Sequence, residues 1–417
     1  MKELSKLNTG FFKRNLIIAK MATQFGKEFF FSSEKEVSNK LGRFLQNKMG
    51  VLTEDLGQLK GSLLKAGQIL SLYGKELLPP EVENLLEELQ SQSSFLSWNQ
   101  ISKQLTQKIL EELVISKSPI AAASIGQVHK AIDKETGKKE YALKIQYKNI
   151  KRVIDLDLKA LKMLLSFTKV VPKDYNLDNI FKEIKVMLLQ EMDYEKEADL
   201  TLKYASLAGD NYIVPQVFKE FSSKTFLCTS FIKGNSIQDE VLKLSQPNRN
   251  KLGKDFFELF FKEIFEWNLV QSDAHAGNYL IKDNKWVLLD FGATKELSQE
   301  IALDYQGIMK GIARRDKKVL WDILEKHNFI DFNNTNEDLL WDYFLLVSEP
   351  FTKKSYDWGN SKIPTQALNR SKDLLKGVKL NYLPHQNLFI DRKIGGLYFI
   401  LKTLKAKGDI IPWDYLD

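Results

Sequence analysis

The segment 271–292, with the sequence QSDAHAGNYLIKDNKWVLLDFG, constrains this chain more than any other. Its pattern predicts a loop, a hairpin of two short strands and a second loop. The hairpin would bring Asn278 and Asp290 side by side, where their side-chain oxygens could hold Mg²⁺ against nucleotide phosphates. Asp273, five residues before Asn278, would then orient or deprotonate an attacking hydroxyl.

An isolated D-F-G triplet is common by chance and usually forms a surface turn. Here it follows D-x-x-x-x-N, with strands expected between them at 279–281 and 286–289. The ordered set is far more specific than its parts, because metal binding and proton handling need all three side chains together. The segment therefore predicts phosphoryl transfer.

The composition agrees with a globular enzyme and narrows little else. The 417 residues suggest two or three structural units. The net charge of +7 is spread along the chain, which fits attraction to a nucleotide or an anionic lipid and does not favour nucleic acid as a partner. The single cysteine, Cys228, excludes an intrachain disulfide and fits a reducing cytosol. The absence of a long apolar run argues against a membrane-spanning helix, and the start does not resemble a signal peptide.

The first part of the chain predicts helices. Residues 1–50 place phenylalanines among lysines, which indicates a basic amphipathic helix that packs on the protein, the more common case, or lies on a membrane. A second helical pattern begins near Thr53, and its Lys65 and Gln68 share a face away from the leucines. Glycines such as Gly67 are costly inside a helix, so they indicate close packing against another surface.

The alanine-rich segment 119–131 predicts a strand, a tight loop and a strand. Its loop could approach phosphates closely, although an ordinary hairpin is the more common form of such a pattern. A strand at 141–146 turns Lys144 away from its apolar neighbours. A lone strand lysine is usually solvated, but kinases present the lysine that binds phosphates and a helix glutamate in this order of elements.

A helix expected at 179–204 carries an acidic cluster at Glu191, Asp193, Glu195 and Glu197. Such a cluster is usually a solvated face, but this one lies between the lysine strand and the catalytic segment. Further on, 218–234 predicts a hairpin that ends in a bend, where the backbone of 230–232 is available to an adenine edge. The aromatic residues of 251–268 have helical spacing and are expected in the core.

Together these motifs resemble those of the atypical protein kinase-like family known as ABC1, UbiB, ADCK or AarF. The resemblance covers about residues 50–300 and, more weakly, 391–413. It implies an α+β, two-lobed protein kinase-like fold. An N-terminal helical extension would occupy 1–105, the N-lobe 106–230, and a mostly helical C-lobe 231–417.

The resemblance also implies roles for single residues. The KxGQ and ExD motifs, which would form a regulatory polar lid, are matched by Lys65, Gly67, Gln68, Glu191 and Asp193. The nucleotide-binding loop and hinge are matched by Ala121, Ala122, Ala123, Ser124, Gly126, Ser230, Phe231 and Ile232. The catalytic groups are matched by Lys144, Glu197 and Asp273, and the metal ligands by Asn278 and Asp290.

The catalytic loop departs from the family pattern, which commonly reads H-x-D-P-H-P-G-N. This chain has Gln271 for the first histidine and Ala274 and Ala276 for the prolines. We expect loss of the histidine to loosen the anchoring of the loop and loss of the prolines to free its backbone. The acidic and amide side chains are kept, so metal binding is still expected.

What the resemblance implies is an Mg²⁺-dependent enzyme that binds ATP or ADP, with ATPase or small-molecule kinase activity in ubiquinone or other isoprenoid-lipid metabolism. A lipid or quinone precursor is the expected ligand, and the expected place is the cytoplasm, with peripheral contact at the inner membrane. Two alternatives stay open. One is a phosphotransferase like the aminoglycoside and choline kinases, which lack KxGQ and ExD, and the other is a nucleotide-binding regulator without turnover.

Overall fold

The computed structural model describes residues 2–4, 66, 94–122, 125–168, 177–379, 381 and 385–416. It contains two compact units, the first formed by Met1–Asp199 with Gln216–Phe231 and the second by Leu200–Pro215 with Ile232–Asp417. Most of the expected helical extension lies outside the described residues. So do five residues with predicted roles, Lys65, Gly67, Gln68, Ala123 and Ser124. Ala66, in the KxGQ motif, is helical and buried.

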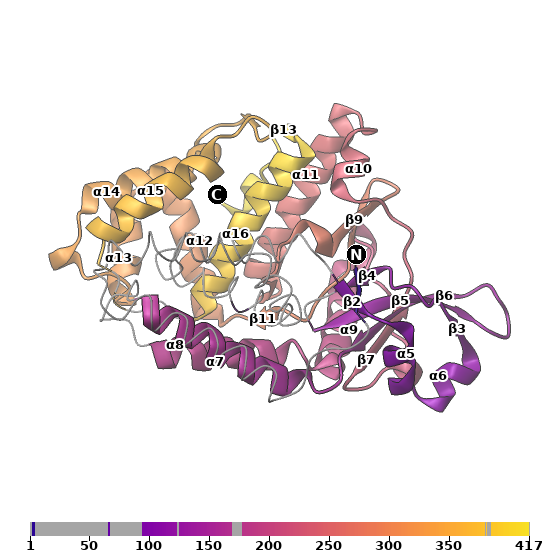
Figure 1. Ribbon diagram of the computed structural model, residues 1–417. Helices are drawn as coiled ribbons and strands as arrows, with labels where there is room; N and C mark the ends of the chain where they lie inside the picture. The colour runs from indigo at the N-terminus through magenta and orange to yellow at the C-terminus, as the bar shows by residue number, and fades with distance from the viewer. Residues whose placement is uncertain are drawn as a thin grey trace. The chain divides into compact units, whose positions relative to one another are not determined.

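The first unit is built on an antiparallel sheet in the order β3, β5, β6, β7, with β4 paired to β5 (Figure 1). The strands are β3 (Leu113–Ile115), β4 (Ala121–Ala122), β5 (Gly126–Asp133), β6 (Glu140–Gln146) and β7 (Phe226–Ser230). A short parallel pair joins β1 (Lys2–Leu4) to β2 (Ser94–Leu96). The strand pair in the alanine-rich segment and the strand that carries Lys144 are confirmed.

Helices accompany this sheet in the first unit. They are α5 (Trp98–Ile101), α6 (Gln107–Glu112), α7 (Ile150–Thr168), α8 (Leu177–Gln190) and α9 (Tyr194–Ala208), of which α9 continues into the second unit. The turn between β5 and β6 is closed by Asp133, whose carboxylate accepts from the backbone and the hydroxyl of Thr136, both at 2.7 Å. Gly137 follows with a φ of +66°, a conformation that glycine adopts without strain.

The single helix expected at 179–204 is wrong, because the chain breaks between α8 and α9. Glu191 and Met192 form a turn, and Asp193 precedes the first residue of α9. The Asp193 carboxylate accepts from the backbone N–H of Lys196 at 3.1 Å, which satisfies a donor at the start of α9. The acidic cluster therefore does not form one continuous face of a helix, because Glu191 lies in a turn and Asp193 caps α9.

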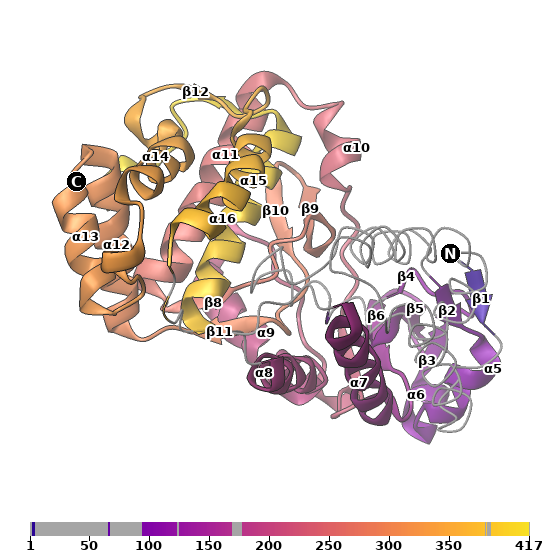
Figure 2. The same cartoon turned by 60° about the vertical axis from the view of Figure 1, so that its left-hand side comes forward.

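The second unit is mostly helical and has an aromatic core. Its helices are α10 (Ile237–Val241), α11 (Gln246–Phe261), α12 (Gln299–Arg314), α13 (Lys317–Lys326), α14 (Glu337–Val347), α15 (Ile363–Gly377) and α16 (His385–Leu404). α11 continues as a π-helical turn, η5 (Lys262–Glu266). Its aromatic residues Phe256, Phe257, Phe260 and Phe261 are fully buried, which confirms that they are core. α11 and α16 lie side by side in both views (Figures 1 and 2).

Short strands position the loops of the second unit. They are β8 (Leu269–Gln271), β9 (Tyr279–Lys282), β10 (Lys285–Leu288), β11 (Thr294–Glu296), β12 (Tyr356–Asp357) and β13 (Lys407–Gly408). β8 pairs with β11, β9 with β10, and β12 with β13, all antiparallel. The predicted hairpin is therefore confirmed. Asp283 and Asn284 turn it with φ of 52° and 54°, the left-handed pair that favours Asn and Asp.

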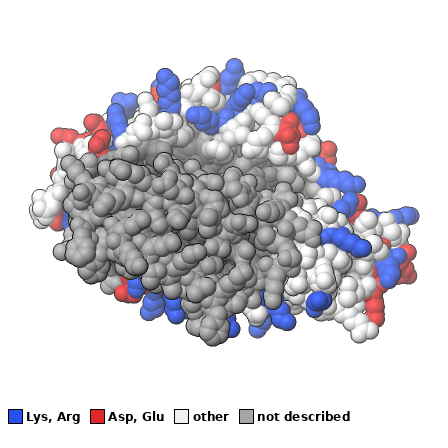
Figure 3. Space-filling model, viewed as in Figure 1, with Lys and Arg blue, Asp and Glu red and all other residues white. Residues whose placement is uncertain are grey.

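Within its described residues, the chain contains no helix that is both long enough and apolar enough to cross a membrane. On the face drawn in Figure 3, the basic side chains that are coloured occur in several places, with acidic side chains among them. This distribution agrees with the scattered charge of the sequence.

The buried His129 of β5 holds a hydrogen-bond network in the first unit. Its Nδ1 lies 2.7 Å from the carbonyl oxygen of Ser116, so Nδ1 carries the proton. Nε2 then accepts from the side-chain amide of Gln127 at 2.8 Å. The amide cannot turn round, because its oxygen accepts from the backbone N–H of Leu96 at 2.8 Å. A second proton on His129 would therefore face a donor.

We predict that the first unit loses stability below about pH 6.5. Burial lowers the pKa of His129, so the folded state favours the neutral ring. For a depressed histidine pKa, stability is complete above the unfolded-state value and falls as the pH drops below it, by at most about 1.4 kcal/mol per pH unit. Urea unfolding at pH 7.5 and 5.5 should show a smaller loss in His129→Asn than in the parent. His275→Asn, at an exposed position, should keep the parental loss; an equal loss in all three proteins would contradict the prediction.

Candidate active site

In the first unit, β6 and α9 bring Lys144 and Glu197 together. The Lys144 Nζ lies 2.7 Å and 2.9 Å from the two carboxylate oxygens of Glu197. The side chains are 15% and 2% exposed, so the pair is largely shielded from water. The bond to both oxygens fixes the ammonium group in one position, which suits a cation that must meet phosphates at a defined place.

The alanine-rich segment lies next to this pair in the same sheet. Ala121 is exposed and Ala122 half-buried on β4, while Gly126 is buried at the start of β5. A Cβ at Gly126 would lie 2.5 Å from the carbonyl oxygen of Ile145 and 2.8 Å from the Tyr194 hydroxyl. Packing between β5, β6 and α9 therefore requires glycine there, whatever the nucleotide needs.

The segment expected to meet an adenine edge has part of its backbone already engaged. The N–H of Ser230 donates to Gln216 at 2.8 Å, and the N–H of Phe231 donates to Glu140 at 3.0 Å. Ser230, Phe231 and Ile232 are all half-buried, and the chain passes from the first unit to the second after Phe231. An adenine edge would have to use other backbone groups of this segment.

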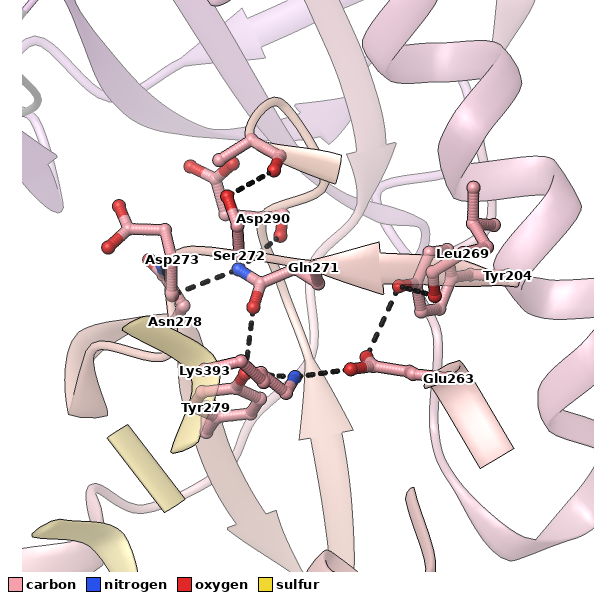
Figure 4. A network of polar contacts seen from close by, with 11 residues as sticks. Tyr204, Glu263, Leu269, Gln271, Ser272, Asp273, Asn278, Tyr279, Asp290 and Lys393 are labelled. Carbon is pink, nitrogen blue, oxygen red and sulfur yellow. Dashed lines mark hydrogen bonds and ion pairs between the residues drawn. The ribbon is translucent and has the colours of Figure 1, made fainter. Parts of the chain in front are cut away.

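In the second unit, β9 and β10 place the predicted metal ligands at one end of the hairpin (Figure 4). Tyr279 pairs with Leu288, and beyond that pair the N–H of Leu289 donates to the carbonyl of Asn278 at 3.0 Å. Asn278 and Asp290 therefore leave the hairpin at the same end. The Asn278 amide nitrogen donates to the carbonyl of Asp273 at 2.9 Å, which leaves its oxygen as the atom suited to a cation.

These groups fit Mg²⁺ by their chemistry. A carboxylate and an amide oxygen are ligands of the hard type that Mg²⁺ prefers. Asp290 is half-buried, and one of its oxygens accepts from the N–H of Gly292 at 3.0 Å, which orients the carboxylate. Asn278 and Asp290 would thus supply two protein ligands from a rigid hairpin end.

Gln271 anchors the catalytic loop, so the expectation that loss of the histidine would loosen this anchoring is wrong, while the effect of Ala274 and Ala276 on the backbone stays a prediction. The side chain is buried, and its amide nitrogen donates to the carbonyls of Asp273 at 3.0 Å and Asp290 at 3.1 Å. Its oxygen accepts from the Tyr279 hydroxyl at 2.9 Å. An amide has two donors and an acceptor, so it joins both loops without the histidine.

α16 contributes residues that sequence reasoning missed. Arg392 pairs with the carboxylate of Asp273 at 2.5 Å, and both side chains are less than one-fifth exposed. Gly396 lies so close to the catalytic loop that a Cβ there would be 2.6 Å from the carbonyl oxygen of Ala274. The only sequence signal was the charged start of the segment 391–413, which has no spacing relation to Asp273.

A second residue of α16, Lys393, forms an ion pair that is more deeply buried than that of Arg392. Lys393 is 0% exposed, and its Nζ lies 2.6 Å from a carboxylate oxygen of Glu263, which is 1% exposed. Burial raises the pKa of Glu263, and the charge of Lys393 opposes that rise. The other oxygen of Glu263 accepts from the Tyr204 hydroxyl at 3.2 Å (Figure 4). This ion pair joins η5 to α16.

The chain is similar to known proteins over most of its length. The family model of the ABC1 atypical kinase-like domain matches residues 88–324. The probable serine/threonine-protein kinase abkA of Dictyostelium discoideum is 30% identical, over 85% of this chain and 68% of that protein. The mitochondrial atypical kinase COQ8 of Saccharomyces cerevisiae is 27% identical over 85% and 73%, respectively. The mitochondrial atypical kinase coq-8 of Caenorhabditis elegans is 28% identical, over 84% of this chain but only 48% of its own length.

A solved structure shares the fold. It is that of Rv3197 with erythromycin, from Mycobacterium tuberculosis, with a TM-score of 0.59 and 22% identity. The match covers 91% of this chain and 97% of the other. With the family match, it confirms the predicted α+β, kinase-like fold.

Proposed function

Because this chain belongs to the ABC1 atypical kinase-like family, we propose that it binds ATP with Mg²⁺ and transfers the terminal phosphoryl group. The acceptor is water or a small hydrophobic molecule rather than a protein. One observation supports this proposal above the others. Asn278 and Asp290 lie together at the end of the β9–β10 hairpin, and the Asn278 side chain contacts Asp273. Carboxylates and an amide in this arrangement suit a metal-assisted phosphoryl transfer.

Each predicted residue has a distinct task in this proposal. When bound, Mg²⁺ would neutralise the charge that develops on the phosphate oxygens. Asn278 and Asp290 would hold the ion, and Asp273 would orient or accept the proton of the attacking hydroxyl. Lys144, kept in place by Glu197, would bind the α and β phosphates. Ala121 and Ala122 belong to the loop proposed to pass over the phosphates.

The acceptor class follows from the family resemblance. We propose an isoprenoid lipid or a quinone precursor as ligand, with the regulatory role of KxGQ and ExD still a prediction. Peripheral membrane contact through the phenylalanine-rich start also stays a prediction, because 5–50 lies outside the described residues. The names of the COQ8 relatives place those proteins in mitochondria.

We expect Asp290→Asn to separate metal binding from folding. The substitution keeps the shape of the side chain but removes the charge from one of the two proposed protein ligands, so Mg²⁺ affinity should fall at least about tenfold. The test is ATP hydrolysis against Mg²⁺ concentration, with and without an isoprenoid quinone precursor in anionic liposomes. The parent should hydrolyse ATP, and the variant should require much more Mg²⁺ at an unchanged melting temperature.

The outcomes of this experiment separate the parts of the proposal. Equal Mg²⁺ dependence in parent and variant would remove Asp290 as a ligand. A parent that consumes no ATP under any of these conditions would overturn the proposed function. If the liposomes and the precursor do not change the rate of hydrolysis, the proposed ATPase activity would stand and the proposed lipid ligand would be removed.

A further inference from the structure

Gln271 holds two loops with one side chain. Its amide nitrogen faces two carbonyl oxygens, those of Asp273 and Asp290, and its oxygen faces the hydroxyl of Tyr279. This assignment of nitrogen and oxygen is the one that satisfies every partner, because a carbonyl can only accept. The loop that carries Asp273 and Asn278 is thereby tied to the loop that carries Asp290.

The hydrogen bonds that lead to Gln271 form a chain in which each group donates to the next. Tyr279 gives its proton to Gln271, so its oxygen is left to accept from the Nζ of Lys393 at 3.3 Å. A buried ammonium at the head of a hydrogen-bond chain polarises each following donor and strengthens it. The chain runs from Lys393 through Tyr279 and Gln271 to the two loop carbonyls (Figure 4).

An imidazole cannot make the same set of bonds. Gln271 uses two donors and one acceptor at once. A neutral histidine offers one donor and one acceptor, and a charged histidine offers two donors and no acceptor. The residue that departs from the family pattern therefore makes one more bond than that pattern allows.

We infer that Gln271 is a positioning residue which, supported by Tyr279 and Lys393, sets the distance between Asn278 and Asp290 and so tunes the metal affinity of the site. This inference rests on the proposed function, because it assumes that these two residues hold the ion. The effect acts through backbone carbonyls, so Gln271 itself need not touch metal or nucleotide.

The test measures metal binding directly. Mn²⁺ is titrated into the full chain with ADP, and free Mn²⁺ is followed by electron paramagnetic resonance, alongside ADP affinity without metal. Gln271→Met has a similar length but no hydrogen-bonding groups, and it should weaken Mn²⁺ binding about 10- to 100-fold, as outer-shell partners of metal ligands typically do. Metal-free ADP affinity should change little. Gln271→His should fall between parent and Met variant, because it keeps one donor.

Tyr279→Phe should weaken Mn²⁺ binding in the same direction but less, and its combination with Gln271→Met should add nothing further. The control is Tyr212→Phe, which removes a hydroxyl that donates to Asp255 at 2.8 Å in the same unit. It should leave Mn²⁺ affinity unchanged. If Gln271→Met does not fold, Gln271→His and Tyr279→Phe give the same test.

The inference would be overturned if Gln271→His and Tyr279→Phe, and Gln271→Met where it folds, bind Mn²⁺ as tightly as the parent. That result would not contradict the proposed function. A parent that binds no Mn²⁺ with ADP would overturn both. A loss of Mn²⁺ affinity in Tyr212→Phe as large as in Gln271→Met would show that any lost hydrogen bond in this unit suffices, which would also overturn the inference.

Discussion

Lys393→Met should lower the free energy of unfolding by about 3–5 kcal/mol at pH 8, because it leaves the buried carboxylate of Glu263 without its partner. Methionine fills much of the same volume, so the loss reports the charge rather than a cavity. Urea unfolding followed by tryptophan fluorescence measures the loss, since Trp286 is fully buried in the same unit.

The loss should shrink as the pH falls. Burial already raises the pKa of Glu263 above its ordinary 4.5, and removal of Lys393 takes away the charge that opposes this rise. An acid whose folded-state pKa is raised contributes most stability below its unfolded pKa, and that stability is lost as the pH rises through the folded value. The difference between variant and parent should therefore be smaller at pH 5 than at pH 8.

Two further variants isolate the cause. Adding Glu263→Gln to Lys393→Met removes the unpaired buried charge and keeps an acceptor for the Tyr204 hydroxyl, so most of the lost free energy of unfolding should return. Lys251→Met breaks a pair of the same 2.6 Å length at an exposed position, 57% and 25% exposed, and should cost less than about 1 kcal/mol. A cost in Lys393→Met no larger than in Lys251→Met would mean that the buried pair contributes nothing.

The local chemistry of the catalytic segment could be predicted from sequence because its parts are close along the chain. Two apolar runs separated by Asp283 and Asn284 favour a hairpin locally, and the residues just outside its ends then meet. The same applies to the strand pair of the alanine-rich segment and the strand that carries Lys144.

The break between α8 and α9 could not be read from hydrophobic spacing, which continues through it. Asp193 competes with the helix by accepting the N–H of Lys196, and a capping aspartate inside an acidic cluster looks like one more surface charge. α7 was also missed, although its buried Val153, Ile154, Leu158 and Leu161 follow helical spacing.

The support of the site from α16 could not be predicted at all. Arg392 and Lys393 stand more than 110 residues from their partners Asp273 and Tyr279, and only the packing of α16 on α11 and the catalytic loop brings them there. Likewise, Gln271 was recognised as a departure, but its effect depends on the distances to two carbonyls that spacing does not contain.

Asp273→Asn should leave nucleotide affinity nearly unchanged and lower turnover about 10²- to 10⁴-fold, the range expected for a positioned general base. Asparagine has the same shape, and its oxygen can still accept from Arg392, so the loop should keep its place. Only the capacity to take a proton is lost. Single-turnover phosphate release from ATP at saturating Mg²⁺ measures the effect, and calorimetry measures nucleotide affinity.

The ion pair with Arg392 offers a competing account, in which Asp273 only fastens α16 to the catalytic loop and the chain is a nucleotide-binding regulator. In that case the parent should already release phosphate at the background rate, and neither Arg392→Met nor Asp273→Asn should change that rate. A general base predicts a split, with stability reduced mainly in Arg392→Met and turnover reduced mainly in Asp273→Asn. Asp255→Asn, which alters an exposed ion pair with Lys251, serves as the matched control and should change neither quantity appreciably. Parental turnover in Asp273→Asn would remove this carboxylate from the chemistry.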